Sequence, residues 1–347
     1  MTKNLFVLVF AFFFIGCSEA SLGFKAIDQD TCVESCDEGT LLSEEPILYP
    51  TAFEIKESQA QDVACARVLD SANKVLNSNV YCDAKHVGKV CNYAFNLERS
   101  VCNKADKIWY QKAIDEASDL YQNDPTSHPK VKLSAGTIKL EYLLPAHWPY
   151  GDYIGIHLKE GVSLEGTSYE SFQTNIRLSK NILKDVDSEQ PLIQDRVLRA
   201  MILVAKNRIY QSPKETVLSE TQNNQIYDLT LSGHFGGDIN CRSLAEQEIG
   251  VESGILAAGV NQIAIRNVQA YHFSGNILEM GLYLPWVKED HLCNGISCLG
   301  KRMWVKGSSS NPAIISKNHL CDGKFGGIVL VGQEAKISDN TIQYIHQ

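Results

Sequence analysis

The sequence predicts an all-β solenoid that follows a shorter, cysteine-rich helical segment. From residue 131 onward, short runs that alternate apolar and polar residues are bounded by Gly or Pro, a pattern typical of strands and turns. One unit also recurs, because Ile315-Ser-Lys-Asn318 matches Ile337-Ser-Asp-Asn340 at a distance of 22 residues. A repeat of this length that contains several short strands predicts coils that stack through parallel ladders.

A second echo lies upstream of this repeat. The tripeptide Asn224-Gln-Ile226 returns as Asn261-Gln-Ile263 after 37 residues. We expect the recurrent Asn to occupy one turn position, where its side chain can stack on the next Asn and cap backbone groups coil after coil.

The composition is that of a folded, globular protein. The chain has 347 residues, of which 44% are hydrophobic and 21% charged, and these fractions argue against general disorder. This length suggests one to three domains at about 150 residues each. The balance of 32 Lys and Arg against 41 Asp and Glu gives a net charge of −9, which disfavours nucleic acid as a partner.

Residues 1–20 are typical of a secretory signal peptide. Lys3 precedes an apolar run of 12 residues, whereas a membrane-spanning helix needs about 20. Phe14-Ile-Gly-Cys17 resembles a bacterial lipobox, with Phe14 in place of the usual Leu, and Ser18-Glu-Ala20 is the rival cleavage site. We favour the lipobox, so Cys17 is the predicted lipidated residue and lipid anchor. The protein is then an outer-membrane or cell-surface lipoprotein, and otherwise periplasmic or secreted.

The remaining cysteines form two even sets. In an oxidising compartment we expect disulfides within each set, with the connectivity left open. A zinc site is disfavoured because no second pair has zinc-like spacing, so we assign no metal ligands. The candidates are Cys32, Cys36, Cys65, Cys82, Cys91 and Cys102 in the first set, and Cys241, Cys293, Cys298 and Cys321 in the second.

The part of the chain before the strands divides in two. Residues 21–57 are rich in Asp and Glu and are predicted to be a polar tether. Residues 58–129 are predicted to be a cysteine-rich helical cap, with amphipathic helices at 58–77 and 105–122. Pro125 ends the second helix.

Residues 130–347 are predicted to form the solenoid. Its last residue, Gln347, follows directly on a strand, so we expect the solenoid to continue past this point or a partner to cover its end. The expected strands are 131–140, 153–158, 161–166, 175–178, 200–204, 225–231, 253–257, 262–267, 275–280, 313–318, 327–331 and 336–340.

Residues 131–166 carry a resemblance to a known superfamily. After the predicted helix 105–122, a strand runs into the Gly136-Thr137 turn, and a later strand reads Gly161-Val-Ser-Leu-Glu-Gly166. This order resembles the start of the right-handed parallel β-helix in the pectin-lyase-like superfamily. The resemblance implies a right-handed, single-stranded parallel β-helix over residues 130–347, with the helix capping its N-terminal end. A β-sandwich is the alternative, and the repeated Ile-x-x-Asn unit disfavours it.

The resemblance also implies a function on polysaccharide, because a β-helix presents a long outer groove that suits a polymer. We therefore expect a polysaccharide or cell-surface glycan as partner, and a lyase, epimerase or hydrolase of uronic-acid or similar glycans. The better-defined pectate-lyase and polygalacturonase motifs are missing. The alternative is a non-catalytic surface β-helix that binds glycan or mediates adhesion.

The richest polar cluster lies at residues 233–291. A base, an acid and an orienting group could come from a Tyr, two His and an Asp in this segment. The enzyme hypothesis requires His234 and His272 to lie on one face. No cofactor is expected, with calcium on Asp-rich turns left open. The candidate catalytic residues are Tyr271, His272, His234 and Asp238, and the candidate ligand-binding residues are Glu279, Lys288, Asp290 and His291.

Overall fold

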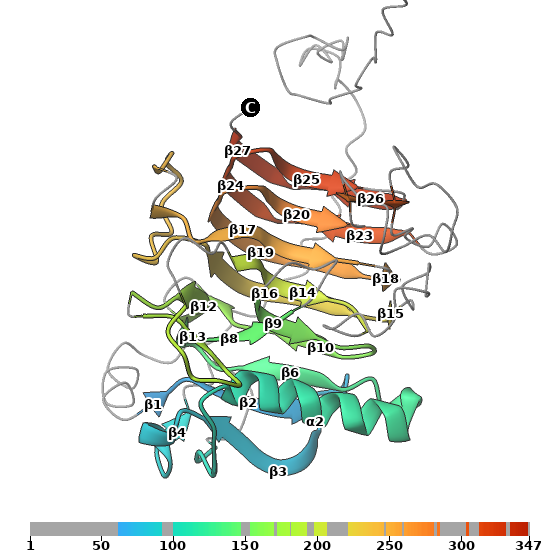
Figure 1. Cartoon of the computed structure of the whole chain (residues 1–347). Coiled ribbons are helices and arrows are strands. Elements are labelled where there is room, and N and C mark those ends of the chain that lie inside the picture. The colour runs from blue at the N-terminus through green and yellow to red at the C-terminus, as the bar shows by residue number, and fades with distance from the viewer. Residues whose placement is uncertain are drawn as a thin grey trace, which may run out of the picture. The chain divides into compact units, whose positions relative to one another are not determined.

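Among the described residues, the computed structural model is mostly β-sheet and contains one α-helix (Figure 1). The chain divides into two units, residues 1–51 and 52–347, and every described residue belongs to the second. The predicted signal peptide and tether, with Cys17, Cys32 and Cys36, therefore lie outside the described residues. These are 62–91, 100–146, 153–169, 172–180, 182–192, 198–206, 221–245, 248–258, 260–280, 283–284, 303–304, 312–330 and 334–345.

The elements follow one another in chain order, and their bounds are these. The first group is β1 (Asp62–Val63), β2 (Cys65–Leu69), β3 (Val75–Cys82), the 3-10 turn η1 (Ala84–His86), β4 (Val90–Cys91), β5 (Lys104–Ala105), α2 (Trp109–Asn123) and η2 (Pro125–Ser127). Next come β6 (Lys130–Leu133), β7 (Gly136–Leu140), β8 (Tyr142–Pro145), β9 (Tyr153–Leu158), β10 (Ser163–Glu165), β11 (Ser168–Tyr169), β12 (Phe172–Leu178), β13 (Lys184–Asp185), β14 (Leu198–Val204), β15 (Thr221–Gln222) and β16 (Gln225–Ser232). The last are β17 (Val251–Ala257), β18 (Val260–Asn261), β19 (Ala264–Phe273), β20 (Asn276–Met280), β21 (Tyr283–Leu284), β22 (Met303–Trp304), β23 (Ala313–Ser316), β24 (His319–Gly323), β25 (Gly326–Leu330), β26 (Ala335–Ser338) and β27 (Thr341–Ile345).

The predicted helix over 58–77 is wrong, because its described part forms a β-hairpin. β2 pairs antiparallel with β3, and Cys65 lies opposite Cys82. The turn between them is held by Asp70, whose Oδ1 accepts the backbone N–H groups of Ala72 (2.9 Å) and Lys74 (2.8 Å). Asn73 adopts the left-handed conformation with φ 66°. Asp and Asn favour such turns, and this turn chemistry decides against a continuous helix.

Two disulfides and the parallel pairing of β1 with β4 hold this N-terminal region together. Cys65 bonds to Cys91, and Cys82 bonds to Cys102. Both pairs lie within the first predicted set, so that expectation is confirmed for these four residues. Disulfides indicate an oxidising compartment.

The predicted helix at 105–122 is confirmed as α2, which begins four residues later because residues 104–105 form β5. Its apolar face, which includes Trp109, Tyr110 and Ile114, is buried in the main core. α2 packs against β2, β3, β6 and β9. It is therefore the element that covers the first strands of the parallel region (Figure 1).

The strands after α2 form three parallel runs, while the sheets as a whole are mixed. The antiparallel pairs are β2 with β3 and β6, β8 with β9, β11 with β12, and β21 with β22. The parallel runs are β6-β10-β16-β19-β23-β26, β7-β12-β16-β19-β24-β27, and β9-β14-β17-β20-β25. β16 and β19 belong to both of the first two runs, which use the first and second halves of these two strands. The strands of the runs lie one above another in Figure 1.

The register confirms one repeat and corrects the other. Ala313 pairs with Ala335, a separation of 22 residues, as the sequence predicts. Gln225 pairs with Ala264, a separation of 39 residues and not 37. Ala264 in turn pairs with Ile314, a separation of 50 residues. The connections between strands therefore vary in length, and this variation is why one fixed period does not run through the sequence.

The predicted Asn ladder is present in the last two repeats. The Asn318 side-chain amide donates to Asn340 Oδ1 (2.9 Å) and also lies 3.1 Å from the Ile265 carbonyl. Asn340 likewise donates to the Ile315 carbonyl (2.9 Å). Each Asn thus satisfies backbone groups at a turn where the strand ladder is interrupted.

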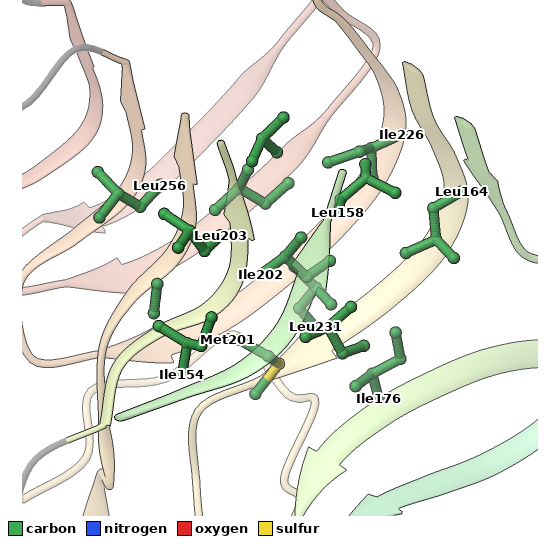
Figure 2. Packing of buried hydrophobic residues seen from close by; sticks show 14 of the residues in the cluster. Ile154, Leu158, Leu164, Ile176, Met201, Ile202, Leu203, Ile226, Leu231 and Leu256 are labelled. Atoms are coloured by element: carbon green, nitrogen blue, oxygen red, sulfur yellow. The ribbon is translucent and has the colours of Figure 1, made fainter. Parts of the chain in front are cut away.

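The core is a continuous cluster of aliphatic side chains. Figure 2 shows side chains of β9, β10, β12, β14, β16 and β17 meeting in this cluster. Among them Leu164, Ile176 and Ile226 are completely buried. Burying a side chain of this size contributes about 1.5–3 kcal/mol, so the inward faces of the strands hold them in register.

Candidate functional site

The predicted catalytic residues lie together, at the ends of two strands. His234 lies two residues after the end of β16, and Tyr271 and His272 lie just before the end of β19, which pairs with β16. The rings of His234 and His272 are 6.0 Å apart between centroids, and those of Tyr271 and His272 are 6.2 Å apart. The two histidines therefore lie on one face, as the enzyme hypothesis requires.

His272 has an acidic partner that the sequence reading missed. Its Nδ1 donates to Asp322 Oδ2 at 2.7 Å, and both side chains are buried. His272 and Asp322 hold the left-handed backbone conformation, with φ 63° and 59°, and these residue types tolerate it best after Gly. His272 Nε2 is buried and has no hydrogen-bond partner among the described residues. This geometry is that of an oriented base, with Asp322 as the positioning group.

Tyr271 also contacts a histidine that was not predicted. The Tyr271 hydroxyl lies 3.4 Å from His319 Nδ1 and 3.3 Å from Gln269 Oε1. Burial raises the pKa of Tyr271, so the phenol stays protonated. His319 is in β24, one strand beyond β19, and only the register brings it here.

Asp238 has a different role from the predicted one. Its backbone N–H donates to His234 Nδ1 (3.1 Å), while its carboxylate binds Arg242 (2.5 Å). The backbone N–H of Asn240 and then Arg242 lower the pKa of Asp238 against the effect of burial. Its carboxylate is therefore a turn and ion-pair group, and Asp322 is the one that orients a ring.

Residues 234–245 lie over this set, and we call this segment the cover. Cys241 of the cover is bonded to Cys321 in β24, a pair within the second predicted set. The Leu244 N–H donates to Asp322 Oδ2 at 3.1 Å. Beneath these contacts His272 is 0% exposed, and the neighbouring Tyr271 is 5% exposed. A polymer cannot reach His272 in this conformation.

The predicted ligand-binding residues do not join the set. Glu279 lies in β20, on the third run, where its carboxylate accepts from Arg199 at 3.0 and 3.1 Å. Arg199 also pairs with Glu252 (3.2 Å), whose pKa is raised by burial and by Glu279 despite the guanidinium. This is a closed ion-pair network. Lys288, Asp290, His291, Cys293 and Cys298 lie outside the described residues.

A groove of about 620 Å³ runs over the outer face of the first parallel run. An outer groove was expected from the sequence, but its place and its lining residues were not. None of its described lining residues is acidic. The cations follow from the register, because successive strands bring residues far apart in sequence into one column. The polar side chains that line the groove include those of Lys130, Gln225, Tyr227, Arg266 and Lys336.

One carboxylate lies beside the groove and is fully neutralised. Glu165 pairs with Lys130 (2.7 Å) and with Lys132, and it accepts the Tyr227 hydroxyl (2.6 Å). Burial acts to raise the pKa of Glu165, but the two ammonium groups and the Tyr227 hydroxyl outweigh it and lower the pKa. Burial and Glu165 raise the pKa of Tyr227. Two cations face one anion, so the cluster is net positive.

The described part of the chain contains no group of three or more His, Cys, Asp or Glu side chains placed to hold a metal ion. Its single α-helix does not have the length and apolarity that crossing a membrane demands. Comparison of the chain with protein-family models, with curated proteins and with solved structures finds no match.

Proposed function

We propose that the protein is an exported, right-handed parallel β-helix that binds an anionic polysaccharide along the groove over β6, β10, β16, β19, β23 and β26. The observation that carries the proposal is the groove itself. It crosses six neighbouring strands and its described lining is basic, although the whole chain has a net charge of −9.

The spacing of the cations supports a polymer as the ligand. Lys130 and Lys336 occupy the first and last strands of the run. At about 4.8 Å per strand, they lie about 24 Å apart along the stack. Arg266 lies between them on β19, and its side chain is exposed. Lys130 is 6% exposed and its ammonium pairs with Glu165, so the cations that a chain of anionic sugars could pair with at once are Arg266 and Lys336.

Tyr227 gives the groove an apolar and hydrogen-bonding surface between the cations. Its hydroxyl is fixed on Glu165, so its ring is held in place on the groove wall. An ordered aromatic side chain binds with little loss of conformational entropy. This feature favours sugar rings over a flexible anion without rings.

Cleavage of the glycan is the second candidate function, and the convergence of Tyr271, His272 and His234 favours it. Two of these side chains are covered, however, and the set lies on the neighbouring run rather than in the groove. Binding without cleavage is therefore the function that the geometry supports best.

Export and anchoring are part of the same proposal. The disulfides support an oxidising compartment. Attachment to a membrane through a lipid on Cys17 remains a prediction from the leader.

The test is a binding titration of the exported chain with uronic-acid, sulfated and neutral polysaccharides. We expect binding of the acidic polymers that weakens as salt is added. Arg266→Ala and Lys336→Ala each weaken binding about two- to fivefold, the range of an exposed ion pair. Lys85→Ala is the matched control, because its side chain is exposed and lies outside the groove lining.

The same incubations separate binding from cleavage. Unsaturated sugar products or new reducing ends would favour the enzyme. Equal affinity for neutral and acidic polymers, or equal losses in Arg266→Ala and Lys85→Ala, would contradict the proposed groove.

A further inference from the structure

The cover, residues 234–245, is held down by contacts that depend on one histidine being neutral. Asp238 donates its backbone N–H to His234 Nδ1 at 3.1 Å. A ring nitrogen can accept this bond only when it carries no proton. The same turn is closed by the Gly237 N–H, which donates to the His234 carbonyl (2.8 Å). Protonation of Nδ1 would place two donors against each other and open the turn.

His234 also faces a second histidine whose orientation is fixed. His272 Nδ1 is committed to Asp322, which leaves its ring 6.0 Å from that of His234 in an edge contact. His272 opposes proton uptake by His234. Charge on His234 therefore weakens the edge contact between the two rings.

The other charged groups around His234 act in both directions. Burial and then His272 lower its pKa, and Lys180, just beyond β12, lowers it further. Glu248 and Asp238 raise it. Asp322 and Arg242 lie one contact away, on His272 and Asp238. The lowering effects prevail, so the covered conformation favours neutral His234.

The cover has a fixed end as well as a releasable one. Cys241 is bonded to Cys321, and Leu244 N–H donates to Asp322. On the other side, Ser232 Oγ donates to the Asp238 carbonyl (2.8 Å). His234 and Phe235 are tied down as well, because His234 forms an antiparallel bridge with Ile249 and the Phe235 N–H donates to the Glu248 carbonyl (3.1 Å). Residues 236–240 can therefore lift as a short arch while the bridge and the disulfide keep the cover on the molecule.

We infer that the cover is an acid-released lid, in which protonation of His234 lifts residues 236–240 and opens a path to His272. This inference rests on the cover alone and is independent of polysaccharide binding in the groove. In the open form, His272 Nε2 faces solvent, with Asp322 still orienting the imidazole. The protein would then present this oriented imidazole only in an acidic surrounding.

The sign of the pH dependence follows from the direction of the shift. The pKa of His234 is lower in the covered form than in an open or unfolded chain, where it is about 6.5. The stabilisation of the cover is complete above that value and is lost as the pH falls through the lowered pKa. The cover is therefore closed at neutral pH and opens on acidification.

Hydrogen exchange of the intact, oxidised chain tests the inference. The protection factor of the Asp238 amide, corrected for the intrinsic pH dependence of exchange, is compared at about pH 7.5 and about pH 5, with the Leu244 amide at the fixed end as a second reference. We expect protection to fall about two- to tenfold on acidification, the range that the loss of one hydrogen bond produces. Amides of β16 serve as the internal reference and should keep their protection.

Two variants sharpen the result. In His234→Asn, the side-chain oxygen can accept the Asp238 N–H but cannot take up a proton, so the pH effect on the cover should disappear. His128→Asn is the matched control, because His128 is exposed in η2's C-terminal turn and far in sequence from the cover. It should behave as the unmodified chain does.

Three outcomes would overturn the inference. They are unchanged protection of the Asp238 amide on acidification, a loss that extends equally to β16, or a loss that persists in His234→Asn. The first two need only the unmodified chain, so the test holds even if the variant does not fold.

Discussion

Two polar clusters lie at opposite ends of the same pair of strands, and only one of them is covered by a loop. Tyr227 and Arg266 are in the first halves of β16 and β19 and face the groove. Tyr271 and His272 lie just before the end of β19, beneath the cover. Both clusters contain residue types suited to binding and catalysis. The comparison teaches that access, set by one disulfide-bonded loop, decides which cluster can meet a polymer.

The largest effect should come from removing the bond that fastens the cover. Replacing Cys241 and Cys321 together by Ser should lower the free energy of unfolding by about 4 kcal/mol, because the bond links residues 80 apart. Urea denaturation of the two proteins measures the difference. Polysaccharide affinity should stay the same, since neither cysteine lines the groove. A matching loss of affinity would break the separation between the two clusters.

A somewhat smaller effect should follow from removing the acid beneath the cover. Asp322→Ala leaves His272 Nδ1 and the Leu244 N–H without their buried acceptor, at a cost of about 3 kcal/mol. Asp322→Asn is the control, because it keeps an acceptor oxygen and tolerates φ 59°. It should recover at least half of the loss in the same denaturation assay. Equal losses in both variants would mean that charge and not hydrogen bonding holds the pair.

The Glu165 carboxylate beside the groove should make the free energy of unfolding depend on pH in the acidic range. The pKa of Glu165 is lowered in the fold, so its stabilisation is present above the unfolded value of about 4.3 and is lost as the pH falls below it. In Glu165→Gln the free energy of unfolding should fall less steeply as the pH is lowered through this range. The difference in slope between the two proteins should correspond to at most about one bound proton. Unfolding curves collected from neutral to acidic pH measure it. Identical slopes in the two proteins would contradict the ion-pair assignment.

The smallest effect on stability is expected in the groove itself. Arg266 is exposed, and no ion pair of its side chain is found among the described residues. Arg266→Ala should change the free energy of unfolding by less than about 0.5 kcal/mol. A large loss would assign Arg266 to the scaffold and remove it from the binding surface.

Much of the strand order was predictable from the sequence. The alternation of apolar residues located β9 and β16 closely, and the 22-residue repeat predicted the pairing of β23 with β26. The apolar spacing of 105–122 predicted α2. Each of these patterns reflects burial on one face, which a local window of sequence can record.

The errors have physical causes that a local window does not contain. The apolar positions at 63–76 fit a helix as well as a hairpin, and the turn at Asp70 and Asn73 decided the outcome. His272 was predicted as part of the site, but Asp322 and His319 were not. These two residues reach it through a strand register with a 50-residue connection. The place of the groove was missed for the same reason, because only the strand register brings Lys130 and Lys336 to the same outer face.

Gln111 in α2 shows how one end of the parallel region is closed to growth. Its side-chain amide donates to the His157 carbonyl (3.0 Å) and accepts the His157 N–H (2.9 Å), as a residue of an adjacent strand would. An unpaired strand edge can template the addition of another chain. Here the helix occupies those two backbone groups of β9, so that position offers no template. A single amide side chain thus takes the place of a neighbouring strand at His157, which removes one site at which another chain could pair.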